Sequence, residues 1–266
     1  MSAHAPVVFV MIDGLRPDAI DAAACTTLQA LRGLSAWTYT AQSIMPSVTL
    51  PCHMSIFHSV PPGRHGVTTN EFQPMARPLP GLFEVAKAHE KQCASIYGWE
   101  PLRNVSRPET LEFAWYRNLT YVPHGDDIIA DVAIDYIATE MPDFAFVYFG
   151  TVDTAGHYYG WMNEGYLAQA ARVDRQLQRL LTALPTDAHV LLQADHGGHE
   201  RSHGTDLPAD MLIPWMMLGP TIRPGHELAA PISLLDTAPT LARMLKIPPH
   251  REWEGRVVSE GFLAPE

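Results

Sequence analysis

The chain has 266 residues, of which 47% are hydrophobic and 18% charged, and its formal net charge is −11. This composition is typical of a folded globular protein and excludes a disordered one. The sequence has no basic run, which argues against a nucleic-acid polymer as the partner because a backbone-binding surface needs clustered lysine and arginine.

Cysteine usage and hydropathy indicate in which cellular compartment we expect the protein. Cys25, Cys52 and Cys93 are too few and too scattered for a disulfide framework or a cysteine-rich zinc site. The apolar run at 7–12 lacks a basic segment before it and a small-residue cleavage site after it, so it predicts a strand rather than a signal peptide. No stretch approaches the roughly 20 apolar residues of a membrane span. We therefore expect a reduced, cytoplasmic enzyme with no membrane partner.

The hydrophobic pattern predicts strands that alternate with helices. In chain order we expect a strand at 7–12, a strand at 94–97, a helix at 126–140, a strand at 144–149, a helix at 164–184, a strand at 190–194 and a helix at 234–245. The strands at 7–12, 144–149 and 190–194 are nearly continuous apolar runs, which favours burial on both faces. The pattern predicts an α/β fold with a mostly parallel central sheet and helices on both faces.

The sequence shows no repeat and no convincing domain boundary, so we expect one domain over 1–266. The stretch 73–123 is the least regular, and we expect it to form long loops near the substrate around the strand at 94–97. Asp13, Asp153 and Asp195 each follow a predicted strand. Ligands of such folds bind at the carboxyl ends of the strands, so the three aspartates are expected to converge.

Two clusters of aspartate and histidine have spacings that suit metal ligation. Asp195-His196-Gly-Gly lies at a strand end, with His203 seven residues after His196. Asp153-Thr-Ala-Gly-His157 places an aspartate and a histidine four residues apart. Taken alone, each cluster also fits a plainer interpretation, a polar turn for the first and a helix-capping aspartate with a surface histidine for the second.

Thr49 is the candidate nucleophile. The segment Pro46-Ser-Val-Thr49-Leu-Pro51 predicts a helix N-terminus, where backbone N–H groups favour an anion such as phosphate. A threonine hydroxyl is a poor nucleophile unless a base or a metal lowers its pKa. An ordinary capping threonine is the plainer alternative, but three strand-end carboxylates and several histidines elsewhere in the chain favour an activated hydroxyl.

Six short motifs follow one another along the chain: Asp13-Gly, Pro-Ser-Val-Thr49-Leu-Pro-Cys-His, His65-Gly-Val-Thr-Thr-Asn70, Asp153-Thr-Ala-Gly-His157, Asp195-His196-Gly-Gly and His203-Gly. Their order resembles the alkaline phosphatase superfamily and, within it, the nucleotide pyrophosphatase/phosphodiesterase branch. Asp236-Thr-Ala-Pro-Thr-Leu and Trp253-Glu-Gly-Arg256 are similar to the C-terminal end of that superfamily. The resemblance therefore covers nearly the full length and implies an alkaline phosphatase-like fold.

The resemblance also implies two divalent metal ions, with Zn²⁺ expected and Mn²⁺ or iron as alternatives. One ion would be held by Asp153, His157 and His203. The other would be held by Asp13, Asp195 and His196, with the Thr49 oxygen as its remaining ligand. Asn70 matches the asparagine that donates a hydrogen bond to a non-bridging phosphoryl oxygen. His199 has no assigned role and is either a contact near the site or a solvated loop histidine.

By resemblance, the chain is expected to be a metal-dependent phosphodiesterase or nucleotide pyrophosphatase that acts on a small phosphoester through a covalent phosphothreonine. The alternatives with the same site are a phosphomonoesterase and a phosphonoacetate hydrolase. The latter needs basic residues, for which Arg64, Arg77, Arg103 and Arg107 are candidates. A sulfatase is disfavoured because Cys52 is not part of a Cys-x-Pro-x-Arg signature. A non-catalytic metal-binding protein is the remote alternative, because it would not need Thr49.

Overall fold

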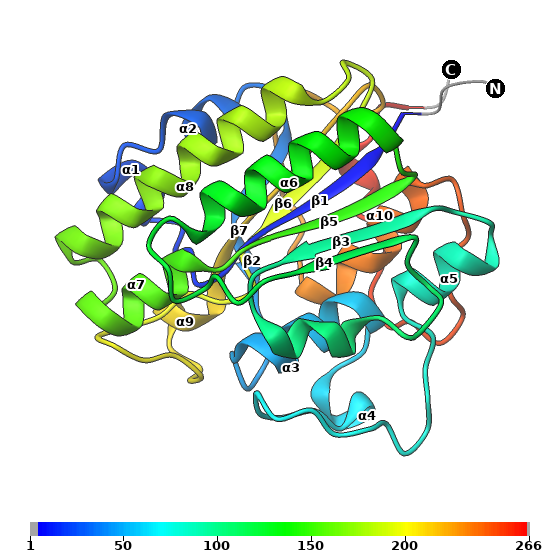
Figure 1. The fold of residues 1–266 in the computed structure, drawn as a ribbon, viewed down its shortest axis with the longest axis horizontal. Helices are drawn as coiled ribbons and strands as arrows, with labels where there is room; N and C mark the ends of the chain where they lie inside the picture. The colour runs from blue at the N-terminus through cyan, green and yellow to red at the C-terminus, as the bar shows by residue number, and fades with distance from the viewer. Residues whose placement is uncertain (1–4, 265–266) are drawn as a thin grey trace.

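The computed structural model describes residues 5–264, and its centre is one eight-stranded sheet (Figure 1). The order of the strands across the sheet is β4-β3-β5-β1-β6-β7-β2-β8. Their bounds are β1 Val7–Ile12, β2 Ala36–Gln42, β3 Cys93–Tyr97, β4 Phe113–Tyr116, β5 Phe144–Phe149, β6 His189–Gln193, β7 Leu212–Leu218 and β8 His226–Glu227.

The sheet is mostly parallel, as predicted. The central strand β1 pairs in parallel with β5 on one side and with β6 on the other. β3 pairs in parallel with β5 and β4, and β8 pairs in parallel with β2. β7 is the exception, because it runs antiparallel to both β6 and β2. The carboxyl ends of β5, β1 and β6 therefore lie side by side at one edge of the sheet.

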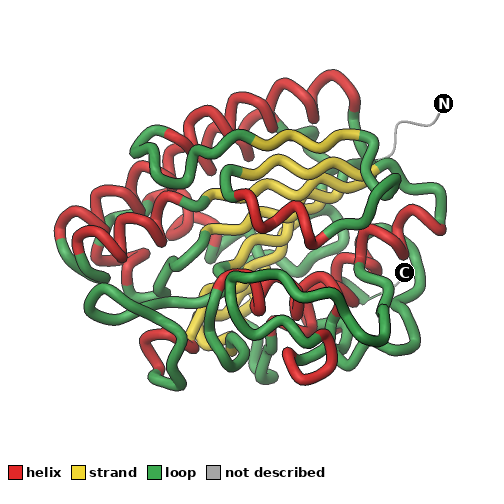
Figure 2. The backbone as a smooth tube through the Cα atoms, turned by 60° about the horizontal axis from the view of Figure 1, so that its bottom comes forward, coloured by secondary structure: helices red, strands yellow, loops and turns green. Residues whose placement is uncertain are grey.

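Helices cover both faces of this sheet, and Figure 2 shows the strands as a twisted layer between them. In Figure 1, α1, α2, α6 and α8 pack together on one face, while α3, α5 and α10 pack on the other. The α-helices are α1 Ala19–Ala22, α2 Thr26–Leu31, α3 Thr49–His58, α4 Pro62–His65, α5 Leu82–Ala88, α6 Gly125–Glu140, α7 Thr151–Tyr159, α8 Glu164–Ala183, α9 Pro208–Met211 and α10 Thr237–Met244. The described residues also contain three 3₁₀ turns: η1 Glu100–Val105, η2 Leu234–Asp236 and η3 Ser259–Gly261.

The apolar runs make the core. All six residues of β1 and all six of β5 are buried, as strands covered on both faces must be. Phe57 of α3 packs its ring edge-on against Phe9 of β1 and Phe146 of β5, at centroid distances of 5.8 and 5.0 Å. These contacts seat α3 on the sheet, so its N-terminal residue, Thr49, is fixed relative to the strand ends.

The predicted elements are largely confirmed, with some corrections. The strands at 7–12 and 144–149 are present as predicted, and the strand predicted at 190–194 begins and ends one residue earlier. The last helix begins as the 3₁₀ turn η2 before it continues as α10. Stretch 73–123 is more regular than predicted, because it contains α5, η1 and β4 besides β3. Strands β2, β7 and β8 were not predicted.

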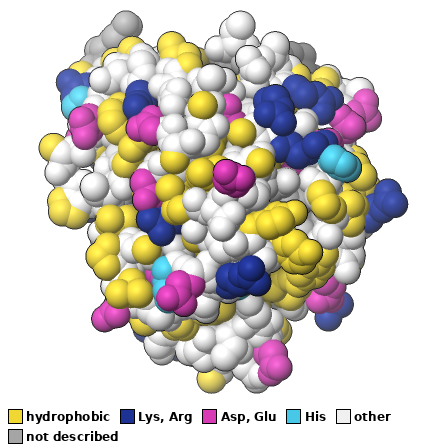
Figure 3. Space-filling model, turned by 90° about the vertical axis from the view of Figure 1, so that its left-hand side faces the viewer, with side chains coloured by type: hydrophobic (Ala, Val, Ile, Leu, Met, Phe, Trp, Pro, Cys, Tyr) yellow, Lys and Arg dark blue, Asp and Glu magenta, His cyan; other side chains and the backbone are white. Residues whose placement is uncertain are grey.

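One face of the molecule is mixed in charge. On the face shown in Figure 3, acidic and basic side chains are interspersed with hydrophobic ones. Within residues 5–264, no helix has the length and hydropathy to cross a membrane.

Candidate metal centre and nucleophile

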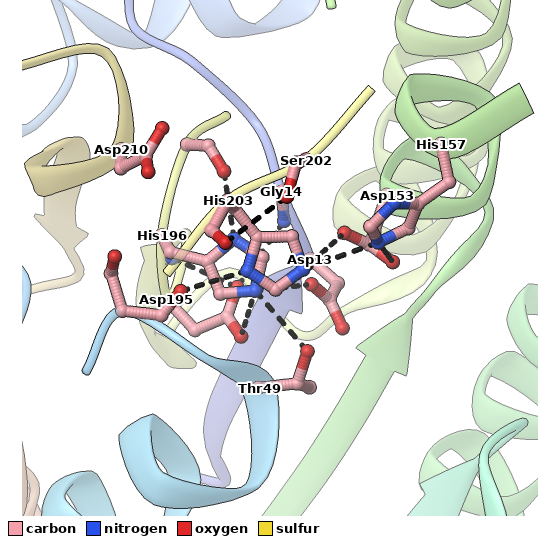
Figure 4. Close-up of polar contacts among 12 residues, drawn as sticks. Asp13, Gly14, Thr49, Asp153, His157, Asp195, His196, Ser202, His203 and Asp210 are labelled. Atoms are coloured by element: carbon pink, nitrogen blue, oxygen red, sulfur yellow. Dashed lines mark hydrogen bonds and ion pairs between the residues drawn. The ribbon is translucent and has the colours of Figure 1, made fainter. Parts of the chain in front are cut away.

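The sheet brings the three strand-end aspartates together (Figure 4). Asp13 follows β1, Asp195 follows β6 by two residues, and Asp153 lies in the first turn of α7, which begins two residues after β5 ends. Because these three strands are neighbours, their carboxyl ends place the aspartates in one cluster. The expected convergence of the aspartates is therefore what the structure shows.

Close packing at this edge requires glycine at position 14. Gly14 has φ +69°, and a Cβ added there would lie 2.9 Å from the Cα of Asp153. The Gly14 carbonyl accepts a hydrogen bond from Trp161 Nε1 at 2.9 Å, and its N–H donates to Asp195 Oδ1 at 3.2 Å. The Asp13-Gly pair thus brings the ends of β1 and α7 into contact.

Three fully buried ligand candidates, Asp13, Asp195 and His196, form what we call the inner group. Asp13 is 1% exposed, and Asp195 and His196 are 0% exposed. His196 Nε2 lies 3.4 Å from Asp13 Oδ1 and 3.4 Å from Asp195 Oδ2. Thr49 Oγ1 lies 3.2 Å from the same nitrogen. The nucleophile candidate thus faces the inner group.

The remaining ligand candidates, Asp153, His157 and His203, form the outer group. His157 Nε2 lies 3.5 Å from Asp153 Oδ2 and 3.2 Å from His203 Nε2. His203 Nε2 lies 3.6 Å from Asp153 Oδ1. The side chain of His157 is 45% exposed, compared with 14% for Asp153 and 8% for His203. The outer group is therefore the side of the site that faces solvent.

The two groups are contiguous. The rings of His196 and His203 stack with their centroids 3.8 Å apart. Ligand atoms of Asp153, His196 and His203 also lie within 4.8 Å of one another, as do those of Asp13, Asp195 and His196. The structure thus gathers all seven side chains that the sequence nominated as metal ligands.

Hydrogen bonds fix the same tautomer in the three histidines that are candidate ligands. The Nδ1 atom of each ring donates to a backbone carbonyl: His196 to Gly197 at 2.8 Å, His203 to Ser47 at 2.8 Å and His157 to Arg201 at 3.0 Å. Each Nε2 is then unprotonated in the neutral ring and presents a lone pair to the site. Two such lone pairs, on His157 and His203, face each other at 3.2 Å, an arrangement that a cation between them would stabilise.

The carboxylates also lack protein partners where an ion would lie. Asp13 Oδ1, Asp153 Oδ1 and Asp195 Oδ2 are buried and accept no hydrogen bond. Burial and then the neighbouring carboxylates raise the pKa of Asp13 and of Asp153 well above its usual value, and burial raises the pKa of Asp195. Buried charges of one sign are stable only when they are paired or coordinate metals. The donor set, carboxylate oxygen with imidazole nitrogen, fits zinc-like ions.

Two of the candidate ligands, His196 and His203, are in the ligating form at neutral pH. Burial lowers the pKa of His196 to about 4 and that of His203 to about 3. A neutral imidazole binds a divalent ion, whereas an imidazolium repels it.

Asn70 lies at the N-terminus of α3. Its Oδ1 accepts a hydrogen bond from the backbone N–H of Leu50 at 2.9 Å, so its Nδ2 is the end left to donate. Thr49 is the first residue of α3, and the residue before it has an extended backbone. A helix N-terminus and a neutral amide donor therefore lie next to the Thr49 hydroxyl, an arrangement suited to an anion.

Two residues that support the candidate ligands were not predicted from the sequence. Tyr148, which is fully buried in β5, donates a hydrogen bond to Asp13 Oδ2 and leaves Oδ1 facing the inner group. Asp210 in α9 accepts a hydrogen bond from His199 Nδ1 at 2.8 Å. His199 is thus bonded to a buried carboxylate rather than being a freely solvated loop histidine. A tyrosine inside an apolar strand and an aspartate in a short turn gave no signal in the sequence.

All four arginines considered for substrate binding form ion pairs with glutamates. The pairs are Arg64 with Glu254 at 2.6 Å, Arg77 with Glu252 at 2.8 Å, Arg103 with Glu100 at 2.7 Å and Arg107 with Glu84 at 2.8 Å. The sequence had left their place open.

Known proteins share this fold and some of this sequence. The chain is 33% identical over 85 residues to the phosphopentomutase of Edwardsiella ictaluri (strain 93-146), which is 32% of this chain and 20% of that protein. The match thus spans a fifth of that relative's length. Murine ectonucleotide pyrophosphatase / phosphodiesterase 5, in an inactive form with AMP, has a TM-score of 0.79 at 13% identity, over 98% of this chain and 100% of that one. A 2-O GAG sulfatase has a TM-score of 0.78 at 14% identity, over 96% of this chain and 73% of that one.

These structural likenesses show that the fold is alkaline phosphatase-like. The family assignment rests on the sequence itself, because the family model for type I phosphodiesterase / nucleotide pyrophosphatase matches residues 7–208. That match includes every candidate ligand, Thr49 and Asn70. The chain therefore belongs to the type I phosphodiesterase / nucleotide pyrophosphatase family, within the alkaline phosphatase superfamily.

Proposed function

We propose that this protein is a two-metal phosphodiesterase or nucleotide pyrophosphatase that works through a covalent phosphothreonine on Thr49. One observation carries the proposal. The Thr49 hydroxyl lies 3.2 Å from an imidazole lone pair, beside buried carboxylate oxygens that have no protein partner. A purely structural metal site has no use for a hydroxyl at this place.

The inner group and Thr49 would hold one divalent ion, and the outer group would hold the other. When bound, the two ions supply positive charge that lowers the pKa of the Thr49 hydroxyl and offsets the charge of the phosphoryl group. Zinc is the ion we expect, because it accepts mixed carboxylate and imidazole ligands.

The chain's own residues then have separate roles. The Thr49 hydroxyl gives up its proton to solvent, and Oγ1 forms a bond to phosphorus as the bond from phosphorus to the leaving oxygen breaks. The leaving oxygen departs with the bonding electron pair and takes up a proton from solvent. Water later attacks the same phosphorus and releases Thr49 with its hydroxyl restored. Asn70 Nδ2 and the N-terminus of α3 stabilise negative charge on the non-bridging oxygens. Because Tyr148 and the backbone carbonyls hold the ligands in place, little reorganisation is needed during the reaction.

A diester suits this charge distribution better than a monoester does. A monoester carries one more negative charge on its non-bridging oxygens and favours an added cation near the phosphate. The four candidate arginines are instead paired with glutamates, and Asn70 is neutral. We therefore propose that the preferred substrate is a diester.

A cavity beside α3 is the place that we propose for the organic part of the substrate. A cavity of about 690 Å³ runs along α3 and is lined by Met54, Phe72 and Tyr97, among others. Phe72 is two residues after Asn70. Apolar and aromatic side chains of this kind suit a ring-bearing group such as a nucleoside. The structural neighbour solved with AMP agrees with a nucleotide substrate.

The test is a comparison of an aryl phosphodiester, an aryl phosphomonoester and an aryl sulfate as substrates of zinc-loaded protein. We expect kcat/KM for the diester to exceed the other two by about tenfold or more, since 1.4 kcal/mol of differential binding to the transition state suffices. Thr49→Ala protein prepared in parallel measures the background from contaminating enzymes. A clear preference for the monoester would move the assignment to a phosphatase.

A further inference from the structure

The ligand His203 lies on a segment that has little regular structure of its own. Between His196 and α9 the chain forms turns and one isolated bridge, between His199 and Ser202. By contrast, Asp13 and Asp195 follow strands of the sheet and Asp153 lies in a helix. A metal ligand on a loop keeps its position only if other contacts hold the loop.

One carboxylate, that of Asp210, holds this loop on both sides of His203. Its Oδ1 accepts a hydrogen bond from His199 Nδ1 at 2.8 Å, four residues before the ligand. Its Oδ2 accepts from the backbone N–H of Thr205 at 2.9 Å and from Thr205 Oγ1 at 2.7 Å, two residues after the ligand. Asp210 is 0% exposed, so these bonds are protected from competing water.

The backbone of α9 also forms hydrogen bonds with this loop. The carbonyl of Asp210 accepts from Gly197 N at 2.8 Å, and that of Ala209 accepts from Gly198 N at 2.9 Å. The helix therefore fixes the start of the loop through its carbonyls and the middle and end through the Asp210 side chain. In none of these contacts does Asp210 touch a candidate ligand atom.

We propose that Asp210 is a positioning residue for the outer metal ion. It holds the 197–205 loop in the one shape that brings His203 Nε2 to Asp153 and His157. The inference rests on the proposed function in one respect, the assignment of His203 as a ligand. The inner ligands Asp13 and Asp195 are placed by the sheet. Losing the hydrogen bonds of the Asp210 side chain should therefore weaken binding of the outer ion far more than binding of the inner one.

The experiment is a zinc titration of chelator-stripped protein by isothermal calorimetry, comparing wild type with Asp210→Ala. His203→Ala, titrated in the same series, shows which of the two affinities belongs to the outer ion. We expect Asp210→Ala to raise the Kd of that ion by about 10- to 100-fold, the range typical for loss of a group that supports a metal ligand. The Kd of the inner ion should change by less than about threefold.

Asp174 provides a matched control. It is 3% exposed and accepts hydrogen bonds from Thr27 N and Leu28 N, both at 2.9 Å, which hold the start of α2. Asp174→Ala removes a comparably buried and bonded carboxylate away from the loop. We expect it to lower the melting temperature of the apoprotein to a similar extent while leaving both zinc affinities unchanged.

The proposal is wrong if Asp210→Ala binds both ions as wild type does, or if Asp174→Ala weakens the outer ion equally. Should Asp210→Ala fail to fold, Thr205→Val removes one of the three donors and must weaken the outer ion selectively, by a smaller factor. If wild-type protein hydrolyses diesters but Asp210→Ala and Thr205→Val both keep wild-type zinc affinities, the role proposed for Asp210 is wrong and the proposed function stands. Wild type that binds no pair of zinc ions overturns both this inference and the proposed function.

Discussion

The inner and outer groups of the site differ in how the fold supports them. The inner ligands follow two neighbouring central strands and are 0–1% exposed. The outer ligands come from α7 and from a loop, and one of them, His157, is 45% exposed. Thr49 faces the inner group, at 3.2 Å from His196. The sheet thus fixes the part of the site that faces Thr49, the candidate nucleophile, while the part that meets solvent depends on a helix and a loop.

This difference has a chemical consequence for binding. A buried ligand set excludes water and holds its ion in a fixed geometry, which favours tight binding. A more exposed set exchanges its ion more readily and leaves space for a substrate oxygen or water to approach. The 45% exposed side chain of His157 makes the outer group the side of the site that solvent reaches.

The largest effect is expected from the nucleophile. Thr49→Ala should reduce kcat for an aryl phosphodiester by about a thousandfold or more, as removal of a nucleophile does in other covalent hydrolases. Thr49→Ser, which keeps the hydroxyl, should retain a substantial part of the activity. Thr49→Ala within tenfold of wild type would show that the threonine oxygen is not the attacking atom.

Ligand variants test the inner–outer comparison directly. Asp195→Ala should abolish turnover, and added zinc should not restore it, because the inner ion loses a buried ligand. His157→Ala should lower kcat/KM at low zinc by about 10- to 100-fold and recover with added zinc, because the outer ion is only weakened. Steady-state assays over a range of free zinc measure both. Equal responses of the two variants to zinc would contradict the comparison.

Removing one inner charge should stabilise the protein without metal. Burial and neighbouring carboxylates raise the pKa of Asp13, so its ionised form is unfavourable in the apoprotein. Asp13→Asn should raise the apo melting temperature at pH 8 by about 2–4 °C, corresponding to about 1 kcal/mol for a chain of this size. Calorimetry of chelator-treated protein checks this. Asp153→Asn, in the more exposed group, should give a smaller rise, and a lowered melting temperature for Asp13→Asn would count against the charge cluster.

A smaller effect is expected from pH. Raised carboxyl pKa values make apoprotein stability fall as pH rises above the unfolded value of about 4, until the folded pKa is passed. Lowered histidine pKa values make stability fall as pH drops from about 6.5 towards the folded values of about 4 and 3. Zinc needs every ligand deprotonated. The rise in melting temperature that zinc produces should therefore grow between pH 5 and pH 8, and a constant rise would contradict the assigned ligands.

The sequence predicted the central strands well and the rest of the sheet poorly, for a physical reason. β1, β5 and β6 are buried on both faces and so appear as continuous apolar runs. β2 alternates buried and partly exposed residues around its threonines, and β7 contains Pro214. A proline counts against a strand in a sequence, yet here the Pro214 carbonyl still accepts from Ala194 N. Whether such segments form strands depends on their pairing with segments that are distant in the sequence, which a local pattern does not record.

The residues of the candidate site were easier to nominate from the sequence than the outer strands of the sheet were. Its ligands carry their chemistry in their residue types, and their spacing within short motifs is visible in the sequence. The supporting residues are different, because they act through hydrogen bonds that the sequence does not record. Tyr148 is 135 residues from Asp13 in the chain, and Asp210 is 11 residues from His199 and 5 from Thr205. Only the folded chain shows that an ordinary tyrosine meets Asp13 or that an ordinary aspartate meets both sides of His203.

The most direct test of the two-ion site is anomalous diffraction at the zinc edge from crystals of the zinc-loaded protein. The inner–outer account predicts two peaks. One should lie among Asp13, Asp195, His196 and Thr49 Oγ1, and the other among Asp153, His157 and His203, with the inner peak keeping full occupancy at the lowest zinc concentration. A single peak, or two peaks away from these side chains, would contradict the account.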